Sequence, residues 1–169
     1  MENTMKISIH GLFLLLFSAL QATLIRHIEI FSVKPDLLLV YVITICFFCP
    51  KTEGGAIGFV FGLFTDIMAG RLLGVNAVLM LIAGFTIAMF CENVFRGNNV
   101  FVVMAAAVIV TFVYNSVHYL FVFSLIGQLD YAYALKSTIW IECLYNAVLC
   151  LPMFFILKKI TVFLYAEKE

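Results

Sequence analysis

The sequence predicts an all-α polytopic membrane protein, a single domain over residues 1–169 built as a bundle of six transmembrane helices. Two observations support this fold class. Hydrophobic residues make up 64% of the chain and charged residues 12%, whereas soluble domains average about 45–50% apolar and about 25% charged residues. The apolar residues also form long runs, and about 20 such residues suffice for one helix to cross a bilayer. Six crossings use most of the chain, so no separate soluble domain is expected.

The apolar runs place the helices at residues 7–25, 36–50, 54–69, 74–91, 99–127 and 136–158. The first run resembles a signal peptide, but it is long and leads directly into further hydrophobic segments, so a retained helix is expected. The second helix follows Lys34-Pro35-Asp36. Proline suits the first turn of a helix, and an aspartate there complements the positive end of the helix dipole. The apolar part of this helix is short, so its flanks must lengthen it or the bilayer must thin locally.

Glycine and polar residues predict where the later helices are connected. Gly70 to Gly74 is so short that the third and fourth helices must form an antiparallel hairpin. The clearest polar loop is residues 92–99, and the segment after it is longer than one crossing requires, so it should tilt, kink or extend. Pro152 lies inside the last helix and predicts a kink there.

The distribution of basic residues predicts the orientation, because Lys and Arg are enriched in cytoplasmic loops. With six crossings, the larger basic set falls on the side of the termini: Lys6, Lys51, Arg96, Lys158, Lys159 and Lys168. The smaller set falls on the other side: Arg26, Lys34, Arg71 and Lys136. Both termini are therefore expected in the cytoplasm.

Several functional classes find no support. Lys plus Arg and Asp plus Glu are equal at 10 each, so no basic face for nucleic acid is expected. The cysteines are odd in number and lie in or beside apolar runs, which favours free thiols over disulfides, and Cys46-Phe47-Phe48-Cys49 lacks a second pair for a metal. Gly54-Gly55-Ala56-Ile57-Gly58 lacks the Lys-Ser/Thr ending of a phosphate loop. No catalytic residues, metal or cofactor are expected.

A stripe of small residues recurs at every fourth position of the third predicted helix and the turn after it. We call this set the glycine stripe: Gly54, Gly58, Gly62, Asp66, Gly70 and Gly74. Each step of four advances about 40° beyond a full rotation, so the stripe winds slowly around the helix. Glycines on one face let another helix backbone approach closely. Two interpretations stay open, namely packing inside the bundle and a docking groove for a partner helix.

Asp66 is a carboxylate inside an apolar segment. At the bilayer centre such a group costs at least about 2.5–3.5 kcal/mol, so it is expected to face the bundle interior or water. It could hold the tight turn by hydrogen bonds and cap the fourth helix, or it could recognise a ligand or partner.

The last two helices carry a second polar set: Asn115, His118, Glu142 and Asn146. Within each helix the two residues are three or four apart and therefore share a face. The two faces are expected to pair. The pairing could be a hydrogen-bond cluster that fixes helix register, or it could form a proton relay or a cation site.

An ordered series of motifs resembles the MreD family of rod shape-determining membrane proteins. The series consists of Lys34-Pro35-Asp36-Leu37-Leu38-Leu39, the segment from Gly54 to Asp66, Gly70 with Leu73-Gly74-Val75-Asn76-Ala77, and the segment from Leu144 to Pro152. The resemblance covers most of the chain, and its specificity comes from the order and spacing of the elements.

The resemblance implies a small six-helix protein of the bacterial inner (cytoplasmic) membrane that binds MreC. It implies membership of the lateral wall-elongation complex, which couples MreB filaments to a SEDS glycosyltransferase and a penicillin-binding transpeptidase. It also implies a fold similar to the S components of ECF vitamin transporters, and it assigns no catalytic residue. The leading hypothesis is therefore a non-enzymatic scaffold, and the alternative is an S-component-like subunit of a vitamin or small-molecule transporter.

Overall fold

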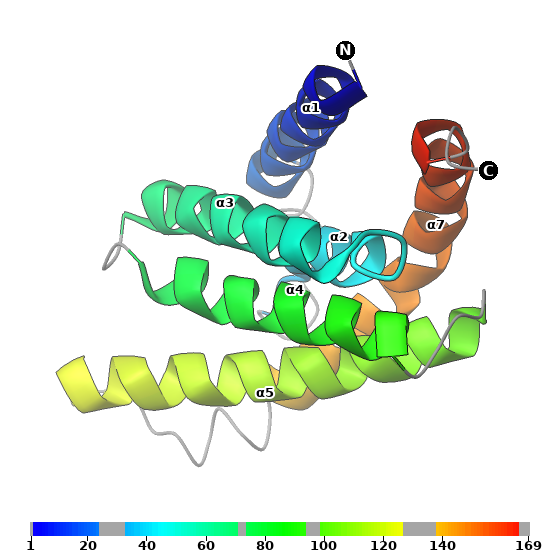
Figure 1. Ribbon diagram of the computed structural model, residues 1–169. Coiled ribbons are helices and arrows are strands. Elements are labelled where there is room, and N and C mark those ends of the chain that lie inside the picture. The colour runs from blue at the N-terminus through cyan, green and yellow to red at the C-terminus, as the bar shows by residue number, and fades with distance from the viewer. Residues whose placement is uncertain (1, 24–32, 71–73, 94–98, 127–137, 166–169) are drawn as a thin grey trace.

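The protein is described by a computed structural model covering residues 2–23, 33–70, 74–93, 99–126 and 138–165. Within these ranges the chain forms six helices: α1 Glu2–Thr23, α2 Leu37–Ile45, α3 Lys51–Ala69, α4 Val75–Asn93, α5 Val100–Ile126 and α7 Ile139–Tyr165. The all-α class expected from composition is confirmed for the described residues. Figure 1 shows α3, α4 and α5 side by side. Helix α2 contacts each of the other five helices.

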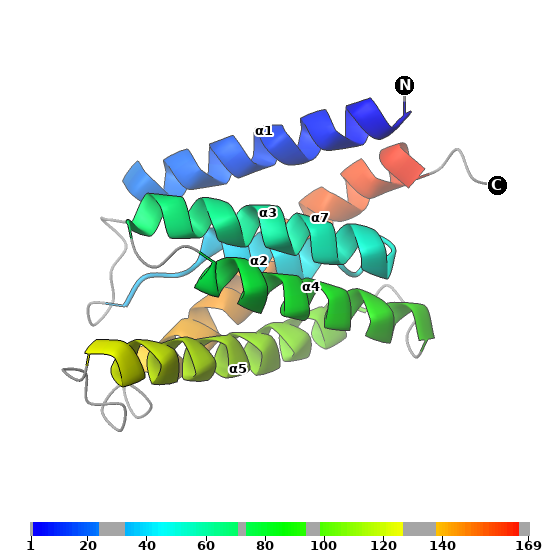
Figure 2. The same cartoon turned by 60° about the vertical axis from the view of Figure 1, so that its left-hand side comes forward.

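Successive helices run in alternating directions through the bundle (Figure 2). Helices α1, α3 and α5 begin on the side where α7 ends, which we call the terminal side. Helices α2, α4 and α7 begin on the opposite side, which we call the distal side. The first turns of three helices therefore lie on one side of the molecule, and the backbone N–H groups of a first turn have no partner within their own helix.

Four of the six helices are long and apolar enough to cross a membrane: Lys6–Thr23 in α1, Val75–Asn93 in α4, Val100–Phe121 in α5 and Ile139–Thr161 in α7. The expected count of six spanning helices is therefore not reproduced. Helix α2 has nine residues, or about 14 Å of helix, against an apolar bilayer core of about 30 Å. Helix α3 has 19 residues but carries Lys51, Glu53 and Asp66, which lower its hydropathy.

Several helix ends differ from their expected positions, and α3 begins at Lys51 rather than at residue 54. Helix α1 begins at Glu2 rather than at residue 7, because its polar first residues continue the helix. Helix α2 ends at Ile45 rather than near residue 50. There Phe47 N and Phe48 N donate to carbonyl groups three residues back, and Pro50 is already the N-cap of α3. Helix α7 extends to Tyr165, past the expected end at residue 158.

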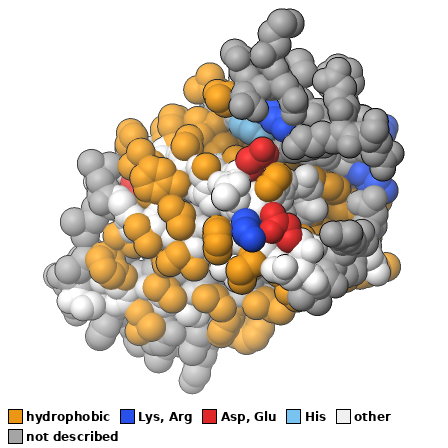
Figure 3. Space-filling model, in the orientation of Figure 1, with side chains coloured by type: hydrophobic (Ala, Val, Ile, Leu, Met, Phe, Trp, Pro, Cys, Tyr) orange, Lys and Arg blue, Asp and Glu red, His pale blue; other side chains and the backbone are white. Residues whose placement is uncertain are grey.

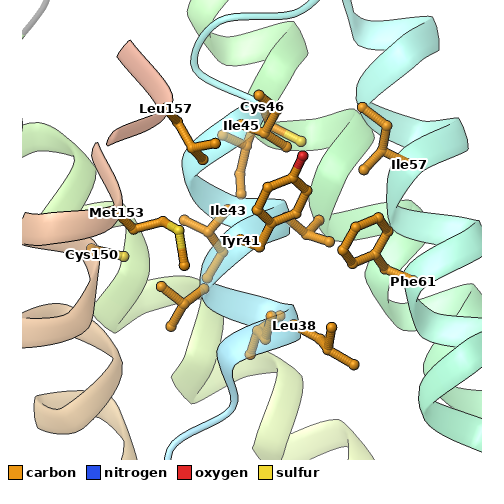
Figure 4. Packing of buried hydrophobic residues seen from close by; sticks show 14 of the residues in the cluster. Leu38, Tyr41, Ile43, Ile45, Cys46, Ile57, Phe61, Cys150, Met153 and Leu157 are labelled. Carbon is orange, nitrogen blue, oxygen red and sulfur yellow. The ribbon is translucent and has the colours of Figure 1, made fainter. Parts of the chain in front are cut away.

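The core surrounds α2. Leu39, Val40, Tyr41, Val42 and Ile43 have no exposed surface. The Tyr41 ring stacks on Phe61 of α3 with centroids 4.8 Å apart, and its hydroxyl lies 2.7 Å from His10 Nδ1 of α1. Figure 4 shows Phe61 on one side of α2 and Met153 and Leu157 of α7 on the other. Helix α2, which is too short to span the membrane, is thus enclosed by other helices on opposite sides.

Candidate functional site

The glycine stripe on α3 faces α4. A Cβ atom added at Gly58 would collide with the backbone carbonyl of Met80, and one added at Gly62 would collide with the backbone of Asn76 and Ala77. At Gly54 a Cβ atom would lie 3.0 Å from both Ala88 Cβ and Gly84 O. These three glycines therefore allow α3 and α4 to pack backbone against backbone, as small residues do in membrane helix pairs.

Gly70 and Gly74 have a different role in the stripe. Their φ angles are +59° and +109°, and no atom lies within 4 Å of a Cβ added at either position. Gly70 ends α3 in a left-handed conformation, with its N–H donating to Ile67 O. Backbone conformation, rather than space, favours glycine at these two positions.

Asp66 is the stripe's carboxylate and is 1% exposed. Its Oδ2 accepts hydrogen bonds from Gly74 N at 2.8 Å and Ala77 N at 3.2 Å, and its Oδ1 accepts one from Asn76 N at 3.3 Å. A side chain of α3 thus satisfies three backbone donors at the start of α4. This geometry is that of a helix cap supplied from the neighbouring helix.

Asn76 extends this cap to α5. Its side chain is 4% exposed, and its Oδ1 accepts a 2.6 Å hydrogen bond from the Tyr114 hydroxyl. The Tyr114 ring also lies beside His118, with centroids 6.2 Å apart and nearly parallel planes. The structure places the His118 ring next to Tyr114 of its own helix. The expected pairing of His118 with the polar face of the last helix stays a prediction.

Asn146 joins three helices at one point. Its Oδ1 accepts a hydrogen bond from Asp36 N at 3.1 Å, and its Nδ2 donates to Thr111 Oγ1 at 3.2 Å. Asp36 is the N-cap of α2, where its Oδ1 accepts from Leu38 N at 3.1 Å and Leu39 N at 3.0 Å. The polar faces of α5 and α7 therefore meet, but Thr111 rather than Asn115 or His118 is the partner of Asn146.

Glu142 of α7 and Asn115 of α5 lie next to the contact between Asn146 and Thr111. Glu142 lies four residues before Asn146 on α7, and Asn115 lies four residues after Thr111 on the antiparallel α5, so both are one turn closer to the distal side. The Asn115 amide lies beside the Glu142 carboxyl group. Asn115 is 5% exposed, and its Nδ2 has no hydrogen-bond partner of normal geometry.

Together these side chains form a polar layer on the distal side of the bundle. We define the layer by its members: Asp36, Asp66, Asn76, Thr111, Tyr114, Asn115, Glu142 and Asn146. Each helix that begins on this side has a carboxylate at its start, because Asp36 caps α2, Asp66 binds the first turn of α4, and Glu142 lies in the first turn of α7. Carboxylates in these positions complement the positive ends of helix dipoles.

Sequence reasoning did not find several members of these contacts. Thr111 and Tyr114 are unremarkable in an apolar helix until the orientation of α5 is known, and Gly84 lies outside the four-residue interval because it belongs to α4. All five cysteines are buried free thiols, as expected. Within the described ranges, no group of three or more His, Cys, Asp or Glu side chains has the spacing of a metal site.

A separate charged group lies on the terminal side. Lys51 Nζ is 3.3 Å from Glu92 Oε2, and Lys51 N donates to Glu92 Oε1 at 2.9 Å, which ties the start of α3 to the end of α4. Lys6 Nζ of α1 is 3.9 Å from Glu53 Oε1 of α3. Figure 3 shows charged side chains gathered in a small group on a face that is otherwise largely hydrophobic.

Comparison with known proteins gives one match. The model of the family described as rod shape-determining protein MreD matches residues 2–160. No curated protein and no solved structure matches the chain. The expected likeness to S components of ECF transporters therefore stays a prediction.

Proposed function

Because the chain belongs to the MreD family of rod shape-determining proteins, we propose that it is a non-enzymatic membrane scaffold of the cell-wall elongation machinery that binds MreC. Family membership implies a role in rod shape determination, in a structural family rather than an enzyme family. Together with the four apolar helices, it also implies a multi-pass membrane protein. The proposal adds a bacterial inner-membrane location with both termini in the cytoplasm. It also adds indirect links to MreB, the SEDS glycosyltransferase and the penicillin-binding transpeptidase.

The observation that best supports a scaffold is how the polar groups of the bundle are used. Asp66 binds three backbone N–H groups, and Asn146 joins α2, α5 and α7. Such bonds fix the relative positions of helices, because interhelical hydrogen bonds and close backbone contacts give specificity where lipid removes the hydrophobic driving force. A rigid bundle of this kind can present a defined outer surface to a partner.

We propose that MreC binds the outward apolar faces rather than the glycine stripe. Gly54, Gly58 and Gly62 are already in contact with α4, so a partner helix has no access to them. Large apolar side chains point outward from every helix that reaches the surface: Leu15 on α1, Val60 on α3, Ile82 on α4, Ile109 on α5 and Leu144 on α7.

Photocrosslinking at these five outward positions tests the proposal. A crosslinking amino acid is introduced at each position in turn, and MreC is detected in the crosslinked products from intact membranes. We expect MreC from positions on one face and not from those on the opposite face. Position 43, where Ile43 is fully buried, is the matched negative control. Absence of MreC from all five positions, combined with failure of MreC to co-purify, would contradict the scaffold.

The transporter alternative has one observation in its favour, which is a buried polar contact inside the bundle between the Asn115 amide and the Glu142 carboxyl group. Under this alternative, the purified protein retains a small organic molecule that mass spectrometry detects, and Glu142→Gln reduces its amount. Under the scaffold proposal, MreC co-purifies and such a molecule is absent.

A further inference from the structure

The last helix of the bundle has a proline in its interior. The chain has three prolines, of which Pro35 and Pro50 precede α2 and α3, whereas Pro152 lies inside α7. Proline has no backbone N–H, and its ring displaces the carbonyl group four residues earlier. The carbonyl oxygen of Val148 therefore lacks the donor that it would have in a regular helix.

This carbonyl group belongs to the outward face of α7. Figure 4 shows Cys150, Met153 and Leu157 directed toward α2, and all three are buried. Val148 lies on the opposite side of α7 and is 60% exposed, and Pro152 is exposed as well. The interruption of the backbone hydrogen bonds is therefore on the side of α7 that is turned away from α2.

The interruption lies at a depth where the surroundings are hydrocarbon. With a rise of 1.5 Å per residue, Pro152 is about 20 Å along α7 from Ile139 and about 9 Å before Lys158. The stretch of α7 that is apolar enough to cross a membrane is Ile139–Thr161. Acyl chains donate no hydrogen bonds, so a backbone carbonyl at this depth must find its donor in protein. The outward face of α7 thus carries an acceptor that lipid does not satisfy.

The side chains around this acceptor have the spacing of a surface on which a second helix packs. Exposed residues recur at alternating intervals of four and three, and we call them the α7 seam: Val148, Pro152, Phe155 and Lys159. These intervals are typical of two helices that pack along their lengths. Three members are apolar, and Lys159 places a positive charge near the end of the apolar stretch. A membrane-spanning helix is therefore the partner whose shape fits the seam.

We propose that the transmembrane helix of MreC packs along the α7 seam and donates a side-chain hydrogen bond to the carbonyl oxygen of Val148. Hydroxyl and amide side chains join helices in membranes, so the donor is a serine, threonine, asparagine or glutamine near the level of Pro152. The inference rests on the proposed function, because it selects one of the outward faces open to MreC. Helices α1, α3, α4 and α5 contain no proline, so the carbonyl groups in their interiors keep regular helical donors and lipid can cover them.

Photocrosslinking in intact membranes tests which face is used. A crosslinking amino acid replaces Val148 and Phe155 in turn, and Ile109 of α5, which is 64% exposed, is the matched outward control. We expect MreC adducts from positions 148 and 155 and none from position 109. Adducts of MreC with other faces only would overturn this inference and leave the scaffold proposal standing. Adducts of the seam with lipid or with a second copy of this chain, and none with MreC, would overturn it as well.

Pro152→Ala tests the acceptor. Alanine restores the backbone N–H, so the Val148 carbonyl regains a donor within α7 and no longer needs the partner. We expect the amount of co-purified MreC to fall at least roughly three-fold, the factor expected for one interhelical hydrogen bond in a membrane, while the thermal unfolding midpoint stays equal or rises. Ile109→Ala should leave the amount of MreC unchanged. Undiminished capture by a folded Pro152→Ala protein would refute the acceptor, and if this variant does not fold, the adducts from positions 148 and 155 decide.

Discussion

The Tyr114 hydroxyl donates a 2.6 Å hydrogen bond to Asn76 Oδ1, while the backbone N–H of the same asparagine donates to Asp66. One residue therefore connects α3, α4 and α5. Both side chains are buried, so loss of either partner leaves a polar group without a hydrogen bond in an apolar surrounding.

Tyr114→Phe should destabilise the bundle by about 1–3 kcal/mol, because the side-chain oxygen Oδ1 of Asn76 remains buried without a hydrogen-bond donor. Reversible unfolding by SDS in mixed micelles measures the change. The double variant Asn76→Ala with Tyr114→Phe should cost less than the sum of the two single variants, because they share one interaction. Additive losses would show that the hydrogen bond contributes nothing.

Asp66→Ala should destabilise the α3–α4 hairpin by at least about 3 kcal/mol, because hydrogen bonds to a charged group contribute about 1.5–3 kcal/mol each and three are lost. Asp66→Asn keeps one acceptor oxygen, so its stability should lie between those of the unmodified protein and Asp66→Ala. Hydrogen exchange at the amides of Gly74, Asn76 and Ala77 measures the local effect. Unchanged protection of these amides in Asp66→Ala would contradict the capping role.

Gly58→Ala and Gly62→Ala should each destabilise the protein by about 1–3 kcal/mol, because the added methyl group collides with the backbone of α4. Gly55 provides a matched control on the same helix. Its added Cβ would lie 3.5 Å from Phe85 Cβ, an ordinary contact, so Gly55→Ala should be neutral or stabilising by up to about 1 kcal/mol. Unfolding by SDS separates the two classes, and equal effects at positions 55 and 58 would refute the packing argument.

Gly70→Ala should cost about 1–2 kcal/mol even though space is available, because a left-handed conformation is unfavourable for a residue with a Cβ atom. Gly70→Asn should cost less, since asparagine tolerates this conformation. The same substitutions at Gly74 should cost more, because a φ of +109° lies outside the left-handed helical region. Thermal midpoints of the four variants give the order, and a more stable Gly74→Asn than Gly70→Asn would contradict it.

The sequence contains enough information to place the hairpin but not the end of α2. The four-residue interval of the glycines and Asp66 is visible because each residue type is unusual for its surroundings. The end of α2 is hidden because Cys46-Phe47-Phe48-Cys49 continues the apolar run, so hydropathy does not change where the helix stops. Pro50 is the first residue that marks a break.

Partner choice within the polar layer could not be predicted for a related reason. Spacing shows which residues of one helix share a face, but it does not give the axial offset between two helices. Asn146 pairs with Thr111, one turn away from Asn115, and this offset follows from how α7 packs on both α2 and α5. Threonine is common in apolar helices, so Thr111 carries no signal by itself.

The contact between Asp36 and Asn146 joins residues 110 positions apart. During synthesis, the ribosome must therefore produce almost the whole chain before the cap of α2 can meet its partner on α7. Until then the shortest helix is enclosed on only some of its sides, and its neighbours must keep it in the membrane. Completion of this protein is thus a late event in biogenesis, and a nascent chain that stops before α7 should be a substrate for membrane quality-control proteases.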